Sequence, residues 1–145
     1  MSDQDSRFMK AAIEIAEKQQ TPFGAVLVKD GTIEMSSANE TRQLNDPTAH
    51  AELLAIRKLA ADLEITNLSG YKLYTTCEPC SMCMSAAIWA NIDELIYGCS
   101  IPEIVNHLDQ ITLRADSIND YSFRKIKVRG GVLKDDCGKL LRLYS

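Results

Sequence analysis

The sequence predicts an α/β domain in which a mixed sheet is covered on both faces by helices. Two observations support this class. Short apolar runs of strand length alternate along the chain with longer segments whose apolar residues recur at helical spacing. The 145 residues, of which 46% are hydrophobic and 25% charged, are enough for one sizeable core, so we expect a single domain over residues 1–145.

The first part of the chain predicts a helix followed by a hairpin. Apolar residues at helical spacing indicate an amphipathic helix over about 5–19, which Thr21-Pro22 ends. The dense apolar run 23–28 is typical of a buried central strand. Asp30-Gly31 is a strong hairpin signal, so segment 32–38 is expected to return as the partner strand.

The middle of the chain predicts two helices, each with a strand beside it. Thr48 is a suitable N-cap for a helix over 49–63, which is rich in Ala, Leu and Glu. A short strand over 71–76 follows. Pro79 is expected at the first position of the next helix, where proline is well tolerated. The apolar run 92–98 predicts another strand.

The last third is less regular. Segment 101–110 is expected to be a short helix or irregular, and segment 111–123 shows no clear pattern. A short strand over 126–129 precedes Gly130-Gly131. Apolar residues in segment 132–144 then predict a closing helix.

Composition limits the partners. The formal net charge of −4 argues against a surface that neutralises many phosphates, although basic residues between 124 and 142 leave room for a local patch. The first 18 residues contain no secretory signal, and no apolar run approaches the ~20 residues needed to span a bilayer. Five cysteines, an odd number, fit a reducing compartment, so we expect a cytoplasmic protein without a membrane partner.

Two short stretches contain the side chains of a metal site. They are His50-Ala51-Glu52 and Pro79-Cys80-Ser81-Met82-Cys83. Zn²⁺ binds imidazole nitrogen and thiolate sulfur, and a catalytic zinc site uses three protein ligands and leaves its fourth position to water. His50, Cys80 and Cys83 supply three ligands. Glu52 then remains as a carrier of protons.

The spacing of these residues fits catalysis. Two thiols three residues apart at the start of a helix can reach one ion, and the helix N-terminus favours their thiolate forms. Two thiolates cancel the charge of Zn²⁺, so a water held there is less acidic than in an all-histidine site. A general base is therefore required, and Glu52 is placed to serve as one.

Other kinds of site are weighed against this one. A thioredoxin-like redox site would leave His50 and Glu52 without a role. A purely structural zinc site would need a fourth protein ligand. The candidates for that ligand are Cys77, Cys99, His107 and Cys137. We expect the three thiols to be buried, Cys77 at a strand end, and the histidine to lie at the surface.

The two motifs together resemble the H-x-E and P-C-x-x-C signature of the zinc-dependent nucleobase deaminases. From about Phe8 to Ser145 the chain is similar to the cytidine deaminase-like superfamily. The resemblance implies a three-layer α/β/α sandwich, one Zn²⁺, hydrolytic deamination catalysed with the help of Glu52, and a homodimer.

The flanking residues resemble two branches of that superfamily. Segment 46–52 occurs both in small bacterial guanine deaminases and in bacterial tRNA adenosine deaminases. Segments 22–26, 77–83 and 88–90 resemble the guanine branch, whereas the tRNA branch usually has Val at the position of Phe23 and Leu at that of Cys77. The ending, 127–144, resembles the tRNA enzymes about as well.

The guanine branch implies a set of substrate-binding residues. Phe23 and Trp89 would line the base pocket, Asn39 would hydrogen-bond the base, and Asp109 would bind the guanine edge. The last match needs a one-residue gap, because this chain has His107-Leu108-Asp109-Gln110 where those enzymes have Gly-Phe-Asp-Asp.

We therefore expect a deaminase of a free nucleobase or nucleoside. The substrate that the resemblance favours is guanine, which would be converted to xanthine and ammonia. The first alternative is a tRNA adenosine deaminase acting on a flipped base. Further candidate substrates are another amino-purine, a pterin, a triazine and cytosine. A zinc-holding interaction domain without catalysis is the remaining class, and an intact Glu52 argues against it.

Overall fold

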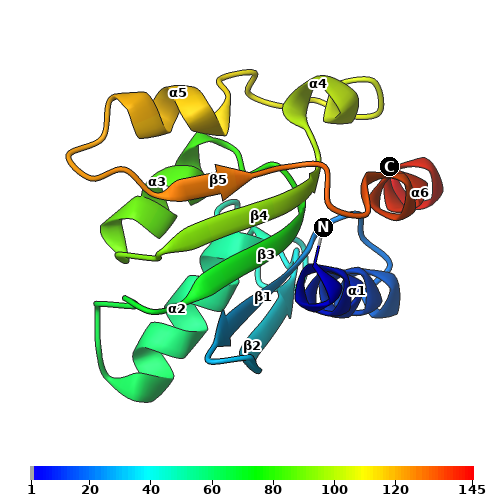
Figure 1. The fold of residues 1–145 in the computed structure, drawn as a ribbon. Coiled ribbons are helices and arrows are strands. Elements are labelled where there is room, and N and C mark those ends of the chain that lie inside the picture. Colours follow the sequence, from blue (N-terminus) through cyan, green and yellow to red (C-terminus); the bar gives the residue numbers. More distant parts are fainter. Residues whose placement is uncertain (1) are drawn as a thin grey trace.

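The computed structural model describes residues 2–145. Its five strands form one sheet in the order β2-β1-β3-β4-β5, with helices on both faces (Figure 1). The elements are α1 (Asp3–Lys18), β1 (Gly24–Lys29), β2 (Thr32–Ala38), α2 (Ala51–Leu63), β3 (Lys72–Cys77), α3 (Ser81–Trp89), β4 (Glu94–Cys99), α4 (Ile101–Ile104), α5 (Ala115–Asp120), β5 (Lys127–Arg129) and α6 (Lys134–Tyr144). The predicted fold class, a three-layer arrangement around a mixed sheet, is confirmed.

The sheet is antiparallel on one side and parallel on the other. The β1–β2 hairpin turns at Asp30 and Gly31, whose φ angles of 49° and 76° fit a tight hairpin turn. β1 also pairs antiparallel with β3, whereas β3, β4 and β5 run parallel. The carboxyl ends of β3 and β4 therefore meet at one edge, where Cys77 is paired with Cys99. Helix α3 starts from that edge.

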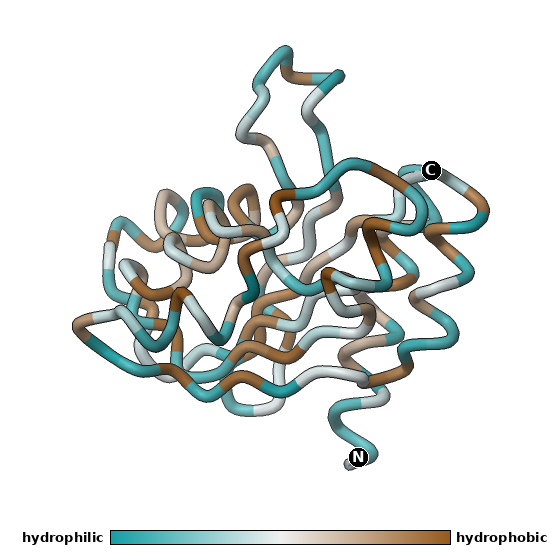
Figure 2. Tube along the Cα trace, turned by 90° about the horizontal axis from the view of Figure 1, so that it is seen from above, coloured by the Kyte–Doolittle hydropathy of each residue, from teal (hydrophilic) through white to brown (hydrophobic). Residues whose placement is uncertain are grey.

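Two apolar cores lie on opposite faces of the sheet. Along β1, Ala25 and Leu27 face the core formed with α2 and α3, while Val26 and Val28 face the core formed with α1 and α6. This alternation follows from the two-residue repeat of a strand. In Figure 2 brown, apolar stretches are concentrated in the interior. The loop that projects at the top of this view is largely hydrophilic. No helix within residues 2–145 is long and apolar enough to cross a membrane.

Both motif helices begin later than predicted. The N-cap of α2 is His50 and not Thr48, whose backbone N–H and hydroxyl both donate to Asp46 in the preceding turn. The N-cap of α3 is Cys80, so Pro79 precedes the helix and is not its first residue. The prediction failed because an Asx-type turn competes for Thr48, and the chain remains extended through Cys80. His50 and Cys80 consequently stand at two helix N-termini.

The region after β4 also differs from the sequence prediction. Only Ile101–Ile104 is helical within segment 101–110, and a Ser100–Glu103 capping box begins it. The patternless segment 111–123 contains α5, whose only buried residue is Ala115. A short helix with so little buried surface has no apolar repeat to detect. The closing helix α6 begins at Lys134, after Leu133 adopts a left-handed conformation.

A buried ion-pair network ties α1 to the sheet. The Asp5 carboxylate accepts hydrogen bonds from Arg129 at 2.8 and 3.1 Å and from the Tyr74 hydroxyl at 2.7 Å. Arg129 also donates to Glu94 at 2.7 Å. These contacts, with Arg129 contributing most, hold the pKa of Asp5 well below its usual range.

Asp5→Asn should therefore reduce stability by about 1–3 kcal/mol at pH 7. Because the pKa of Asp5 is lower in the folded than in the unfolded protein, its contribution is complete above its ordinary pKa and declines as the pH falls further. Urea unfolding at pH 7 and pH 3 should show a smaller difference between variant and wild type at pH 3. Equal differences at both pH values would contradict the assignment. Asp3→Asn, which removes an exposed carboxylate of the same helical turn, is the control.

Candidate active site

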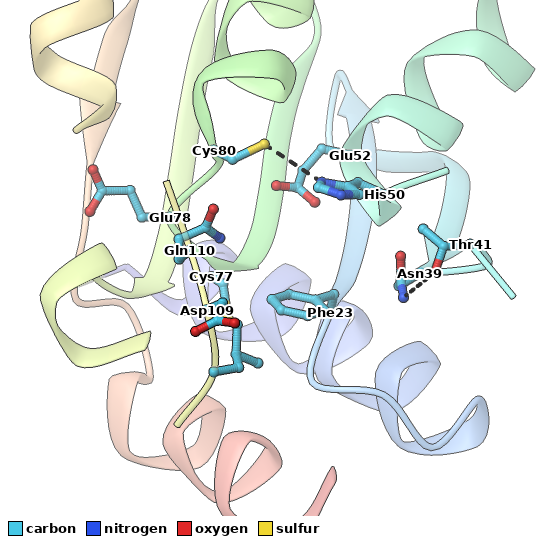
Figure 3. Close-up of a pocket in the computed structure, with 11 residues that line it drawn as sticks. Phe23, Asn39, Thr41, His50, Glu52, Cys77, Glu78, Cys80, Asp109 and Gln110 are labelled. Atoms are coloured by element: carbon cyan, nitrogen blue, oxygen red, sulfur yellow. Dashed lines mark hydrogen bonds between the residues drawn. The ribbon is translucent and has the colours of Figure 1, made fainter. Parts of the chain in front are cut away.

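The three predicted zinc ligands converge where the starts of α2 and α3 meet. Their nitrogen and sulfur ligand atoms all lie within 4.8 Å of one another. The sulfurs of Cys80 and Cys83 lie 3.6 and 3.7 Å from His50 Nδ1, and Figure 3 shows the Cys80 sulfur directed at the imidazole ring. One nitrogen and two sulfurs are a donor set that Zn²⁺ prefers. The residues present therefore fit a zinc ion.

The surroundings of the two cysteines favour the thiolate form of Cys80, whereas the contact with Cys80 raises the pKa of the Cys83 thiol. Hydrogen bonds from Cys83 and His50 lower the pKa of Cys80 to about 4. The contact with Cys80 in turn raises the pKa of His50. A thiolate is the metal-binding form of cysteine, so this arrangement prepares Cys80 to bind a cation.

None of the candidate fourth ligands joins the cluster within the described chain, residues 2–145. Cys77 is buried at the end of β3, as expected, and Cys99, at the end of β4, and Cys137, on α6, are buried in the core on the α1 and α6 side of the sheet. His107 is exposed. Three protein ligands with a fourth position free is the composition of a catalytic zinc site, not of a structural one.

Glu52 lies beside the cluster in the first turn of α2 and is buried. Burial raises the pKa of its carboxyl to about 7, and the negative charge of Cys80 adds to the rise. A cation bound by the three ligands would act in the opposite direction. In Figure 3 the carboxylate faces the pocket from next to His50. A carboxyl group in this position can both accept and donate a proton near neutral pH.

A cavity of about 180 Å³ opens in front of these groups. It is lined by Phe23, Asn39, Thr41, His50, Glu52, Cys77, Glu78, Cys80, Leu108, Asp109 and Gln110. The structure thus brings three of the four expected substrate-binding residues to the pocket: Phe23, Asn39 and Asp109. Asp109 is exposed and lies at the rim.

Trp89 is not among the pocket residues, contrary to the expectation from the guanine branch. It lies at the C-terminal end of α3, whereas the ligands occupy the N-terminal end of this helix. Its side chain is 75% exposed and packs against Phe123, with ring centroids 5.0 Å apart. The helix carries Trp89 away from the site, so in this chain it does not form a wall of the pocket.

Some pocket residues had no signal in the sequence. Thr41 accepts a hydrogen bond of 3.4 Å from the Asn39 amide and so fixes the side chain of a predicted substrate ligand. Leu108 and Gln110 flank Asp109 in an irregular segment. Glu78 precedes the Pro79-Cys80 motif, and this adjacency is the one sequence feature that could have drawn attention to it.

The fold is a mixed sheet flanked by helices, and the starts of two of these helices bring one histidine, two cysteines and a buried glutamate together beside a pocket. This combination of fold and site defines a zinc-dependent hydrolytic deaminase. Residues 2–99 match the family described as the cytidine and deoxycytidylate deaminase zinc-binding region. The chain belongs to this deaminase family, as its motifs predicted.

Its relatives bear the names of two different activities. A tRNA-specific adenosine deaminase of Buchnera aphidicola subsp. Baizongia pistaciae (strain Bp) is 37% identical over 99% of this chain and 90% of that protein. A guanine deaminase of Bacillus subtilis (strain 168) is 44% identical over 63% of this chain and 62% of that protein. A solved structure from a study of A-to-I editing by tRNA:A34 deaminases has a TM-score of 0.80 and 33% identity, and the match covers 93% of this chain and 99% of that one.

Proposed function

We propose that this chain is a tRNA adenosine deaminase, which converts adenosine in a tRNA to inosine and releases ammonia. The observation that supports this choice is the extent of similarity. The tRNA-acting relative of Buchnera aphidicola is 37% identical over nearly the whole of both chains, whereas the Bacillus subtilis guanine deaminase aligns over about two thirds of each. The structure from the A-to-I editing study is 33% identical to this chain, whereas a guanine deaminase structure from Nitrosomonas europaea, which covers 96% of this chain with a TM-score of 0.87, is 25% identical. The editing hypothesis therefore takes precedence over the guanine hypothesis that the flanking residues favoured.

The pocket suits a single extruded base. Enzymes that modify a base within a nucleic acid take it out of the stack and enclose it in a pocket beside the catalytic groups. Phe23 would present an apolar wall to the base, and the Asn39 amide, held by Thr41, would hydrogen-bond its edge. Asp109 at the rim is exposed, and the strand attached to the base would leave the pocket on this side.

Zinc, when bound by His50, Cys80 and Cys83, supplies an acidified water as the nucleophile. Glu52 takes one proton from the water and delivers it to the ring nitrogen, and then takes the second proton from the hydroxyl group formed on the reacting carbon and delivers it to the leaving amine. The carbon–nitrogen bond to the exocyclic amine breaks, and a carbonyl takes its place. The burial that excludes water from Glu52 also strengthens its interactions with the charged groups of the reaction.

A direct comparison of substrates tests the proposal. The purified protein is incubated with a tRNA stem-loop containing adenosine in the loop, with free adenosine and with guanine. We expect inosine to form in the stem-loop faster than ammonia is released from either small molecule. The same RNA annealed to its complement is a matched control, and it should react more slowly because extrusion then requires unpairing. Faster deamination of guanine than of the stem-loop would overturn the proposal.

Guanine deamination is the second candidate, and the position of Asp109 favours it. The 2-amino group of guanine is the leaving group and has to face Glu52, so a carboxylate at the rim can accept a hydrogen bond from a ring N–H on the far side of the base, such as N9–H, which adenosine lacks because its N9 carries the ribose. The similarity to the Bacillus subtilis guanine deaminase adds support.

Asp109→Asn separates the two candidates. If guanine is the substrate, the variant replaces a carboxylate acceptor of a ring N–H by an amide, and kcat/KM for guanine should fall by roughly 100-fold or more. If tRNA adenosine is the substrate, the same change should alter kcat/KM only about threefold or less, because adenosine has no ring N–H to donate. Steady-state kinetics on both substrates measure this, with Gln110→Ala as the neighbouring control.

A further inference from the structure

Glu78 is a buried carboxylate that borders the pocket but points away from its centre. In Figure 3 its carboxylate lies on the opposite side of the backbone from Glu52 and His50. The side chain is 1% exposed, and Arg114 Nε lies 2.9 Å from Oε1 and 3.0 Å from Oε2. A charge can be buried at acceptable cost only where donors replace the lost water, so these donors fix the position of Glu78.

Two backbone amides complete the set of donors. The N–H of Ile101, at the start of α4, donates to Oε1 at 2.8 Å, and the N–H of Ala115, at the start of α5, donates to Oε2 at 2.9 Å. Arg114 directly precedes Ala115 in the chain. The Glu78 carboxylate therefore binds α4, which precedes the irregular segment 105–113. It also binds Arg114 and Ala115, which follow that segment.

That segment, which we call the pocket loop (residues 105–113), is held at its start by hydrogen bonds to α4 and by Leu108, which packs against the core, but its second half has few contacts of this kind. It contains Leu108, Asp109 and Gln110, all of which line the cavity. In the part of the chain that the structure describes, the backbone of residues 109–113 makes no hydrogen bond to a helix or strand, and the Ile111 N–H is satisfied by the neighbouring Gln110 side chain. The placement of the loop consequently depends on how its ends are fixed.

Glu78 is at the same time fixed relative to the zinc ligands. Its N–H donates to the carbonyl of Cys99 at 2.7 Å, and it is separated from Cys80 only by Pro79. A displacement of the carboxylate would thus shift the pocket loop relative to Cys80. The contacts connect one wall of the cavity to the metal centre through a single side chain.

We propose that Glu78 is a positioning residue that holds the pocket loop against the cavity and thereby sets substrate affinity. It acts through Arg114 and the amides of Ile101 and Ala115, and takes no part in proton transfer. The inference rests on the proposed function only in treating the cavity as the substrate site, and it applies equally to a tRNA base or to guanine.

The test is Glu78→Gln, with Glu103→Gln as its matched control. The glutamine amide nitrogen would face N–H donors that need an acceptor, so one end of the loop should detach. KM for whichever substrate is turned over should rise by roughly tenfold, which corresponds to about 1.4 kcal/mol, while kcat changes little. Hydrogen exchange in residues 105–113 should become faster and zinc content should stay unchanged.

Glu103 caps the same α4 through Ser100 without touching Arg114 or Ala115, so its variant should retain wild-type KM and loop exchange.

Substitutions at Arg114 provide a second measurement should Glu78→Gln fold poorly. Arg114→Gln removes the cation but leaves the backbone amides, and should raise KM and speed up loop exchange. Arg114→Lys retains a cation beside Glu78 and should restore part of the effect. Unchanged KM and unchanged loop exchange in both Glu78→Gln and Arg114→Gln would overturn the inference. Hydrogen exchange is measured without substrate, so a faster loop in a protein that deaminates neither tRNA nor guanine would support the inference while refuting the proposed function.

Discussion

Glu52→Gln should leave the fold and the zinc content intact and remove nearly all deaminase activity. Glutamine has almost the same shape as glutamate, and Glu52 is not one of the three metal-binding residues, so neither packing nor metal binding loses a partner. An amide cannot accept and return a proton as a carboxylate does. General acid–base groups typically contribute ~10²–10⁴-fold to the rate, and Glu52 is assigned several proton transfers, so the loss should be at the upper end of this range.

The measurements are kcat on the preferred substrate, zinc content and thermal unfolding. Burial alone disfavours the charged form of Glu52, so in the metal-free protein the neutral glutamine, which fills the same space, should be tolerated without loss of stability. Glu14→Gln, which changes an exposed carboxylate on α1, is the control for a general effect of lost charge. A Glu52→Gln variant with more than roughly a tenth of wild-type activity would show that another group transfers the proton.

Cys83→Ala should abolish zinc binding and, with it, much of the stability and all measurable turnover. Cys83 is fully buried, and its sulfur is one of only three converging ligand atoms in the described chain. Zinc binding is linked to folding, because a preformed site does not exist in the unfolded chain. At a free zinc concentration of about 1,000 times its Kd, the ion stabilises the native state by about 4 kcal/mol, which the variant should lose.

Metal analysis and urea unfolding with and without added zinc measure both effects. Cys99→Ala is the matched control, because Cys99 is also a buried free thiol but lies outside the metal cluster. It should lower stability through a lost core contact and still bind zinc. Two results would refute the assignment of a three-ligand site: a Cys83→Ala protein that retains stoichiometric zinc, or a zinc complex in which His107 or Cys77 completes the tetrahedron.

The metal cluster and the strands could be predicted from the sequence because their determinants are local. His50 and Glu52 are neighbours in one helix start, and Cys80 and Cys83 are neighbours in another, so residue type and spacing define the donor set before any packing is known. The strands β1 and β3 are short apolar runs next to turn signals. Such features survive in any fold that keeps the helix and strand repeats.

The composition of the pocket was decided by the tertiary structure. Trp89 was expected in the pocket on the basis of similarity, but the direction of α3 carries it to the opposite end of the helix from the zinc ligands, where it packs on Phe123. Glu78 looked like an ordinary acidic residue, and its importance depends on Arg114 and Ala115, which join it only because β3 and β4 run parallel and bring α4 and α5 to the same edge. These contacts connect residues far apart in the chain. No repeat or spacing in the sequence encodes them, because they depend on how the strands are ordered in the sheet and on where each helix points.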